Sequence, residues 1–148
     1  MKPAAFVAGA LLLFFAAAAA DLGLRSRQAL AEAKRHEAWA AAPALKKKHF
    51  EALHAGAVSR LERDAAAGSL SAEQSKAARA ALDAELEFNL SESSAKQAYA
   101  WYRTAAREFR SPLNPWAAEA EARLPAAREA WRAELAAKGI KAEDWRLD

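Results

Sequence analysis

The chain of 148 residues contains no cysteine, a single methionine, five glycines and five prolines. The absence of cysteine excludes disulfides, thiolate metal sites, cysteine nucleophiles and a lipid-modified N-terminal cysteine. β-Branched residues are also scarce, because the whole sequence has two valines, one isoleucine and one threonine. Since these residues are typical of strands, their scarcity argues against a sheet and predicts an all-α fold.

Residue patterns that carry catalysis or hold a metal are lacking as well. The three histidines, His36, His49 and His54, form no His-Glu-x-x-His motif. The sequence has no glycine-rich phosphate loop and no nucleophile elbow, and its carboxylates are scattered among basic residues. We therefore predict a protein that is not an enzyme, with no catalytic residues, no cofactor and no metal site.

Neither sign of charge dominates the sequence. Twenty-two basic residues stand against 19 acidic ones, which gives a net charge of +3, and the signs are interspersed. This pattern is typical of solvated helical surfaces, so we expect no nucleic-acid partner. The one basic run, Lys46 to Lys48, indicates either a patch for an anionic ligand or, more simply, a solvated helix face.

The longest uncharged run extends over the 18 residues from Pro3 to Ala20. Its last three alanines, directly before Asp21, match the cleavage site of a secretory signal peptide. The alternative is an uncleaved anchor, since the run approaches the ~20 residues that span a bilayer. Arg25 and Arg27 follow the run and favour the cytoplasmic side for that end. We predict export to the periplasm or cell envelope and a mature chain that begins at Asp21. In the alternative, a single-pass protein, the membrane is also a partner.

Two helices joined by a Ser-Pro-Leu-Asn-Pro corner are predicted between residues 95 and 140. We expect Asn114 to cap the second helix, Pro125 to kink it and Gly139 to end it in the left-handed conformation. One apolar stripe follows its face: Trp116, Ala120, Leu124, Ala127, Trp131 and Leu135. We expect Trp131, in the middle of this stripe, to be buried against the first helix.

Aromatic residues are concentrated in this part of the chain, which holds both tyrosines and three of the five tryptophans. Their simplest role is packing in the core. A groove that contacts a partner is the alternative, because tryptophan and tyrosine are enriched at binding hot spots. The candidate interaction residues are Tyr99, Trp101, Tyr102, Trp116 and Trp145.

A second pair of helices is predicted between Pro43 and Leu90. Apolar or neutral residues recur every four positions in both: Leu45, His49, Leu53, Ala57 and Leu61 in the first, and Ala78, Leu82, Leu86 and Leu90 in the second. Gly68 suits the end of the first helix, and Ser71 with Gln74 forms a capping box for the next. Because the connection is short, we expect antiparallel neighbours.

Two stretches resemble known families. Residues 95–140 resemble a helical hairpin of the tetratricopeptide-repeat family, through the small-aromatic-small spacing of Ala98, Tyr102 and Ala105 and the Pro-containing passage after them. This resemblance implies a helical-hairpin packing mode and a role in protein interaction. Residues 61–86 resemble the periplasmic Leu-Thr-x-x-Gln chaperone and stress-sensor family through Leu70, Ser71 and Gln74. The same segment is similar to a juxtamembrane hairpin of a cytochrome c assembly subunit.

These patterns divide the chain into four parts. Residues 1–20 form the signal peptide or anchor, and residues 21–42 form an N-terminal helical arm, loosely docked because its apolar residues share no stripe. Residues 43–140 form a helical-hairpin domain, either TPR-like or a small bundle, and residues 141–148 form a tail. We predict an exported, non-enzymatic envelope protein that acts through a protein partner. The alternatives are a small envelope chaperone or stress-sensor module and a single-span accessory subunit of a membrane complex.

Overall fold

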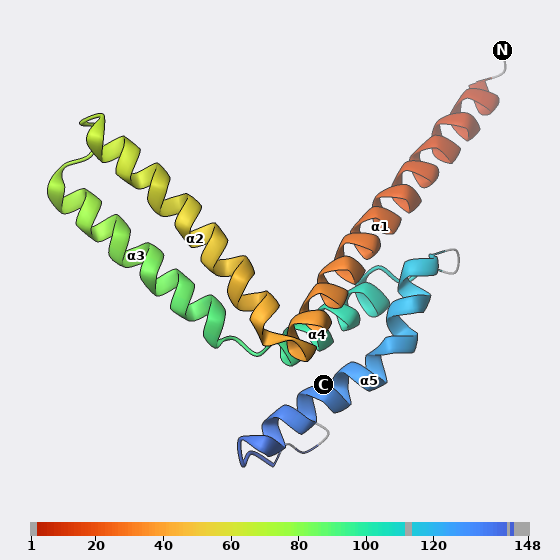
Figure 1. The fold of residues 1–148 in the computed structure, drawn as a ribbon. Helices are drawn as coiled ribbons and strands as arrows, with labels where there is room; N and C mark the ends of the chain where they lie inside the picture. The colour runs from red at the N-terminus through yellow and green to blue at the C-terminus, as the bar shows by residue number, and fades with distance from the viewer. Residues whose placement is uncertain (1–2, 112–113, 142, 144–148) are drawn as a thin grey trace. The chain divides into compact units, whose positions relative to one another are not determined.

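The computed structural model describes residues 3–111, 114–141 and 143, with side chains from Val7 onward. Every regular element within these residues is helical, which confirms the predicted all-α class (Figure 1). In chain order the elements are α1 (Pro3–Ala41), α2 (Pro43–Ala66), α3 (Ala72–Ser91), α4 (Ser94–Arg103), the π-helical segment η1 (Thr104–Glu108) and α5 (Pro115–Ala137).

The helices are grouped into two compact units, and the boundaries differ from the predicted domains. Unit 1 combines the chain up to Glu37 with the chain from Ser94 onward, and unit 2 contains Ala38–Ser93. The prediction had joined residues 43–140 into one domain and had separated residues 21–42 as an arm. In the structure, most of that arm belongs to the same unit as the C-terminal helices.

The C-terminal half of α1 is part of the core of unit 1, so the interpretation as a loosely docked arm is corrected. Ala29, Leu30 and Ala33 are buried in the same cluster as residues of α4 and α5. Ser26 is fully buried, and its hydroxyl donates a hydrogen bond to the carbonyl of Ala105 in η1, at 3.3 Å. The packed face consists mainly of small residues, which is why an apolar stripe was not visible in the sequence.

The remainder of this core comes from α4, η1 and α5. Its fully or nearly fully buried residues there are Tyr99, Tyr102, Ala105, Ala106, Ala120, Leu124 and Ala127. Trp131 is only half-buried and stacks on Tyr99, with 5.6 Å between ring centroids and 28° between ring planes. It therefore contacts the helix that was predicted, but from the rim of the core.

Both ends of α5 follow the local chemistry of the sequence. The Asn114 side chain accepts hydrogen bonds from the backbone N–H groups of Trp116 and Ala117, and Pro115 occupies the first turn. At the other end Gly139 has a φ of +74°, and the N–H of Ile140 donates to the carbonyl of Leu135, as in a Schellman ending. Pro125 lies inside the helix, and α5 is visibly bent along its length (Figure 1).

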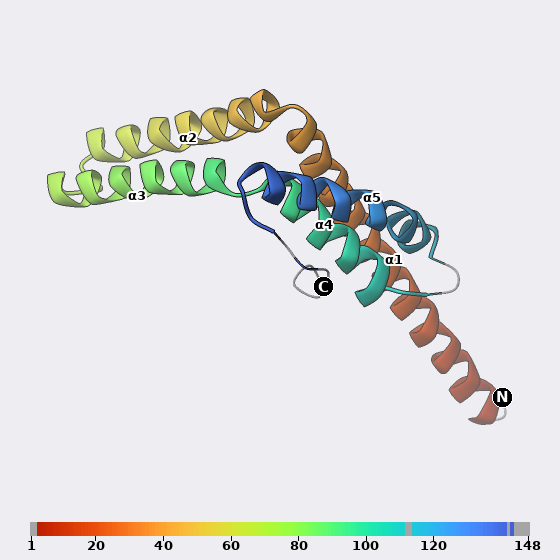
Figure 2. The ribbon, with the colours of Figure 1, turned by 90° about the horizontal axis from the view of Figure 1, so that it is seen from below.

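Unit 2 contains an antiparallel hairpin of α2 and α3, which lie side by side in both ribbon views (Figures 1 and 2). Gly68, with a φ of +71°, ends the first helix. Ser71 accepts a hydrogen bond from the N–H of Gln74, and the Gln74 side chain accepts one from the N–H of Ser71. Both the glycine stop and the capping box are therefore confirmed.

The first half of α1 is apolar, and from Val7 onward its side chains are exposed. Leu12, Leu13, Phe14 and Phe15 are each exposed by more than half of their surface. By length and composition α1 is sufficient to cross a membrane, and a signal sequence has the same properties. It continues without a break through the predicted cleavage site into the helical turns that carry Ser26 and Ala29.

Candidate functional site

The candidate site is a groove along one face of the α2–α3 hairpin, which we call the hairpin groove. It has a volume of about 270 Å³. Its lining residues come from both helices: Phe50, Leu53, His54, Ala57 and Arg60 from α2, and Leu82, Glu85, Leu86 and Asn89 from α3. Apolar side chains dominate this set, and the polar ones can orient a bound segment.

The hairpin leaves much of its apolar surface open. None of the side chains of α3 is buried, and Val58 and Lys46 are the buried residues of α2. Leu53, inside the groove, is 55% exposed. Two helices alone cannot cover both of their apolar faces, because a helix must bury its stripe against another element. The hairpin groove is therefore the part of unit 2 best suited to receive a further helix.

One edge of the groove carries an ionic cluster that links the two helices. Nε2 of His54 lies 2.7 Å from Oδ1 of Asp83, and Nε of Arg79 lies 3.4 Å from the same oxygen. The hydrogen bond with His54, followed by the charge of Arg79, holds the pKa of Asp83 below its ordinary value. The carboxylate therefore stays ionised at neutral pH and presents a fixed polar edge beside the apolar lining.

Lys46 has a structural role in this hairpin. Its ammonium donates hydrogen bonds to the carbonyl oxygens of Leu90 and Glu92, at 3.3 and 2.5 Å, and the residue is buried. A cation in this place stabilises the C-terminal end of α3, where unpaired carbonyls concentrate negative charge. Lys46 therefore belongs neither to a patch for an anionic ligand nor to a solvated helix face, and both interpretations are corrected for this residue. Lys47 is exposed, and its Nζ lies 3.7 Å from Oε1 of Glu51.

The predicted interaction residues lie in unit 1, not at the hairpin groove. Tyr99 and Tyr102 are buried in the core, so neither presents a surface to a partner. Trp101 and Trp116 are half-buried and pack against the same core. Trp145 lies outside the described residues. Of the described candidates, only these two tryptophans therefore combine an aromatic body with an accessible face.

Tyr102 also belongs to a polar network that connects α1, α4 and α5. Its hydroxyl donates a 2.5 Å hydrogen bond to Oε2 of Glu37, and Nη1 of Arg123 donates to the same oxygen at 3.2 Å. Burial first, and then the bond to Glu37, raises the pKa of Tyr102 to about 12. Nζ of Lys34 lies 2.7 Å from Oε1 of Glu119. The hydrogen bond and charge of Lys34, together with the charge of Arg123, lower the pKa of Glu119. This network therefore links α1, α4 and α5 at the surface of the core.

The titratable groups beside the groove include one hydrogen-bonded His–carboxylate pair. No group of three or more His, Asp or Glu residues among them is arranged to hold a metal ion. In unit 2, His54 forms a hydrogen-bonded pair with Asp83, and no serine or threonine lines the groove beside His54. The arrangement is suited to binding an apolar segment.

Sequence reasoning found part of the groove and missed the rest. The four-residue spacing identified Leu53, Ala57, Leu82 and Leu86, which the structure brings together. It missed Phe50 and the polar members of the lining, because they lie beside the stripe and not on it. It also missed the function of Lys46, for which a lysine in the first turn of a helix gives no signal.

Ser71 and Gln74, which carry the resemblance to the chaperone motif, form a helix cap here. Comparisons with protein-family models, with curated proteins and with solved structures find no match for the chain.

Proposed function

We propose that this is a non-enzymatic interaction protein of the cell envelope that stays in the membrane through α1 and binds a helix of a partner protein in the hairpin groove. The observation that carries the proposal is the open apolar face of the hairpin, whose α3 has no buried side chain. The resemblance of residues 95–140 to a tetratricopeptide-repeat hairpin agrees with an interaction role.

The continuity of α1 supports the retention of residues 1–20 in the mature protein. The helix is continuous across Ala20 and Asp21, and Asp21 pairs with Arg25 one turn later, at 2.8 Å. Inside a continuous helix the backbone groups of Ala20 and Asp21 are hydrogen-bonded, which makes this peptide bond less accessible to a protease than one in an extended segment. The large side chains before it, such as Leu13 and Phe14, are exposed. A surface of that kind is stable in a hydrocarbon environment and prone to association in water.

A helix is the occupant that fits the groove best. The groove lies between two antiparallel helices, so a third helix can pack along it and complete a three-helix arrangement. Arg60 and Glu85 give its edges opposite charges, and Asn89 adds an amide. The partner segment is therefore an amphipathic helix with apolar residues three and four positions apart and with charges of both signs beside its stripe.

The first test concerns the membrane. We expect the full-length chain to remain with the membrane after washing at alkaline pH, and its intact mass to include residues 1–20. The physical reason is the apolar run of α1, which has no charged residue between Pro3 and Ala20. A chain that is released by the wash, with a mass that begins at Asp21, would contradict retention and establish a cleaved signal peptide.

The second test concerns the groove. Leu53→Asp should weaken partner binding by about 2 kcal/mol, or about thirtyfold in the dissociation constant, as the loss of a central interface residue does. Its fold should change little, because Leu53 is already 55% exposed. The measurement is recovery of proteins cross-linked to the full chain in intact membranes, followed by titration of the recovered partner.

Leu45→Asp is the matched control. Leu45 lies on the same helix and is 53% exposed, but it does not line the groove. A partner recovered with the parent and with Leu45→Asp, but lost with Leu53→Asp, supports the proposal. Equal recovery with all three chains would exclude the groove as the binding site, and loss with both variants would indicate general disruption of α2.

A further inference from the structure

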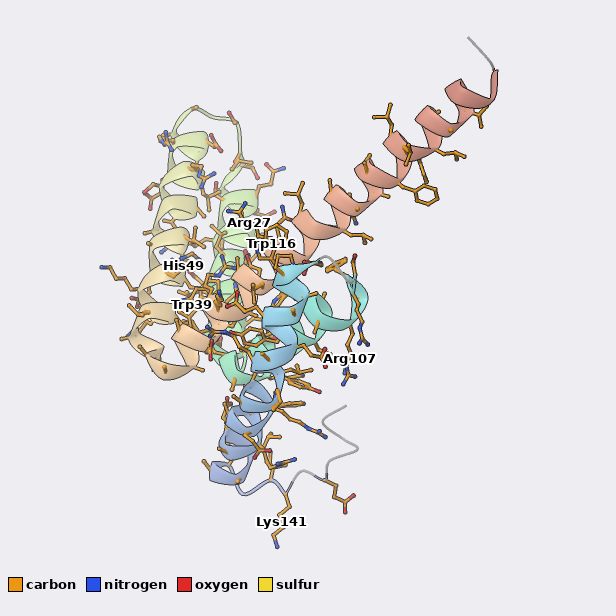
Figure 3. All side chains as sticks on the ribbon, turned by 90° about the vertical axis from the view of Figure 1, so that its right-hand side faces the viewer. Arg27, Trp39, His49, Arg107, Trp116 and Lys141 are labelled. Carbon is orange, nitrogen blue, oxygen red and sulfur yellow. The ribbon has the colours of Figure 1, made fainter. Side chains whose placement is uncertain are left out.

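Trp116 lies against α1 directly after the apolar run. A Cβ atom placed on Gly23 would come within 3.2 Å of Cζ3 of its indole, so the ring rests on the helix where a side chain is missing. Figure 3 shows Trp116 at the start of α5, beside α1. This contact fixes the height of the tryptophan relative to the apolar segment of the same helix.

The height follows from helix geometry. Gly23 is three residues beyond Ala20, which is about 4.5 Å along the axis at 1.5 Å per residue. The headgroup region on each side of a bilayer is about 5–7.5 Å thick, because the hydrocarbon core measures ~30 Å within a total of ~40–45 Å. If Ala20 lies at the hydrocarbon boundary, Trp116 lies within the headgroup region, where tryptophan is enriched.

The corner at the start of α5 is held firmly at this level. The Asn114 side chain caps α5 and also donates a hydrogen bond to the carbonyl of Phe109, at 2.9 Å. Ser26, less than one turn beyond Gly23, donates to the carbonyl of Ala105 in η1. Movement of η1 along α1 would therefore break the buried hydrogen bond between Ser26 and Ala105.

Basic side chains surround the corner. Arg27 on α1 is exposed, and Arg110 is exposed beside the start of α5. Three acidic groups lie nearby: Asp21, which pairs with Arg25, Glu108, whose carboxylate lies 3.5 Å from the hydroxyl of Thr104, and Glu121, which lines the same pocket as Arg110. Arg107 is exposed as well, so Arg25, Arg27, Arg107 and Arg110 outnumber these carboxylates by one. This excess gives the corner a weakly positive character, and each basic residue near an anionic surface contributes about 1 kcal/mol.

We infer that the corner of unit 1 at Gly23, Arg27, Arg110 and Trp116 contacts the headgroup layer of an anionic bilayer, with Trp116 as the interfacial anchor. The inference rests on the proposed function, because it needs α1 in the membrane. This contact is a second attachment to the membrane beside α1. The indole and the two arginines hold the C-terminal helices of unit 1 against the lipid surface and restrict rotation of the unit about the axis of α1.

The test uses the full chain in vesicles of phosphatidylcholine and phosphatidylglycerol. Lipids brominated near the headgroup end of their acyl chains should quench tryptophan fluorescence in the parent. Trp116→Phe should remove more than half of the quenchable fluorescence. Trp131→Phe should leave it unchanged, because Trp131 stacks on Tyr99 at the rim of the core, fifteen residues along α5 from Trp116. Circular dichroism confirms that each variant remains folded.

The preference for anionic lipid is read from the same signal. Brominated phosphatidylglycerol should quench about twice as strongly as brominated phosphatidylcholine at the same mole fraction, and Arg27→Gln with Arg110→Gln should make the two equal. Lys76→Gln, an exposed charge on α3, serves as the control.

Each outcome has a separate meaning. If the chain does not stay in the vesicles after alkaline washing, the proposed anchoring fails and the inference fails with it. If the chain stays and Trp116→Phe leaves the quenching unchanged, the inference alone is overturned. If Trp116 is quenched equally by both lipids in the parent, the anionic preference is overturned.

Discussion

Replacement of Tyr102 by alanine is expected to lower the free energy of unfolding of unit 1 by about 3–5 kcal/mol, as aromatic-to-alanine changes in packed cores do. Tyr102 is 0% exposed and lies among residues of α1, α4 and α5. The substitution removes its packing contacts, leaves a cavity and takes the hydrogen-bond donor from Glu37. Chemical denaturation of the full chain in detergent, followed by circular dichroism, measures the change.

Tyr102→Phe separates the two contributions. It keeps the ring and loses the hydroxyl, so we expect a cost of about 1–2 kcal/mol, the range for a hydrogen bond to a charged group. Glu37 is half-exposed and keeps Arg123 as a partner, which limits the penalty. Equal effects of the two variants would show that the network carries the stability and that the ring is poorly packed. A harmless Tyr102→Ala would contradict the core described for unit 1.

Enlargement of Ala120 should have the second largest effect. Ala120 is 0% exposed at the place where α5 packs into the core of unit 1. Extra methylenes in a filled core force side chains and backbone to shift, at a cost of about 1–3 kcal/mol. We therefore expect Ala120→Leu to lower the midpoint of denaturation, although leucine is a good helix former and more apolar than alanine.

Ala130→Leu is the control for this substitution. Ala130 lies on the same helix and is exposed, so leucine there meets no packed neighbour and should leave the midpoint nearly unchanged. The pair thus compares identical chemistry on two faces of α5. Similar destabilisation at both positions would indicate an effect on the helix itself, and stabilisation by Ala120→Leu would show that the core contains unfilled space.

The candidate site could be predicted only in part. The four-residue spacing of leucines predicted two helices with a short turn between them, and the bounds of α2 and α3 confirm both the helices and the turn. Whether their apolar stripes face each other or remain open depends on the packing of the pair. The structure leaves a groove of about 270 Å³ there, with Leu53 more than half exposed.

The aromatic residues illustrate the limit of a sequence pattern. Tyr99, Tyr102, Trp101 and Trp116 were grouped as interaction candidates because they are large and close in the chain. The structure separates them. Successive residues of an α-helix are rotated by about 100°, so neighbours in the chain point to different faces. Tyr99 and Tyr102 thus enter the core, while Trp101 and Trp116 keep an accessible side.

The sequence by itself determined the elements whose causes are local. The scarcity of β-branched residues predicted an all-α chain, and the helix ends followed from Asn114, Gly68, Gly139 and the pair Ser71 and Gln74. Each of these features depends on contacts within about five residues, such as a side chain that caps an N–H group or a glycine with positive φ. Such contacts form wherever the short segment occurs, so a reader of the sequence can identify them.

The tertiary structure alone decided which helices share a core. Apart from Leu30, the buried residues that join α1 to the C-terminal helices are small: Ser26, Ala29 and Ala33, which carry almost no hydrophobic pattern. Small side chains stabilise a contact because they let two backbones approach closely. The close approach requires a partner helix, which here lies about 80 residues away in the chain. The same reason explains Lys46, whose buried ammonium meets the carbonyls of Leu90 and Glu92 only after the hairpin has closed.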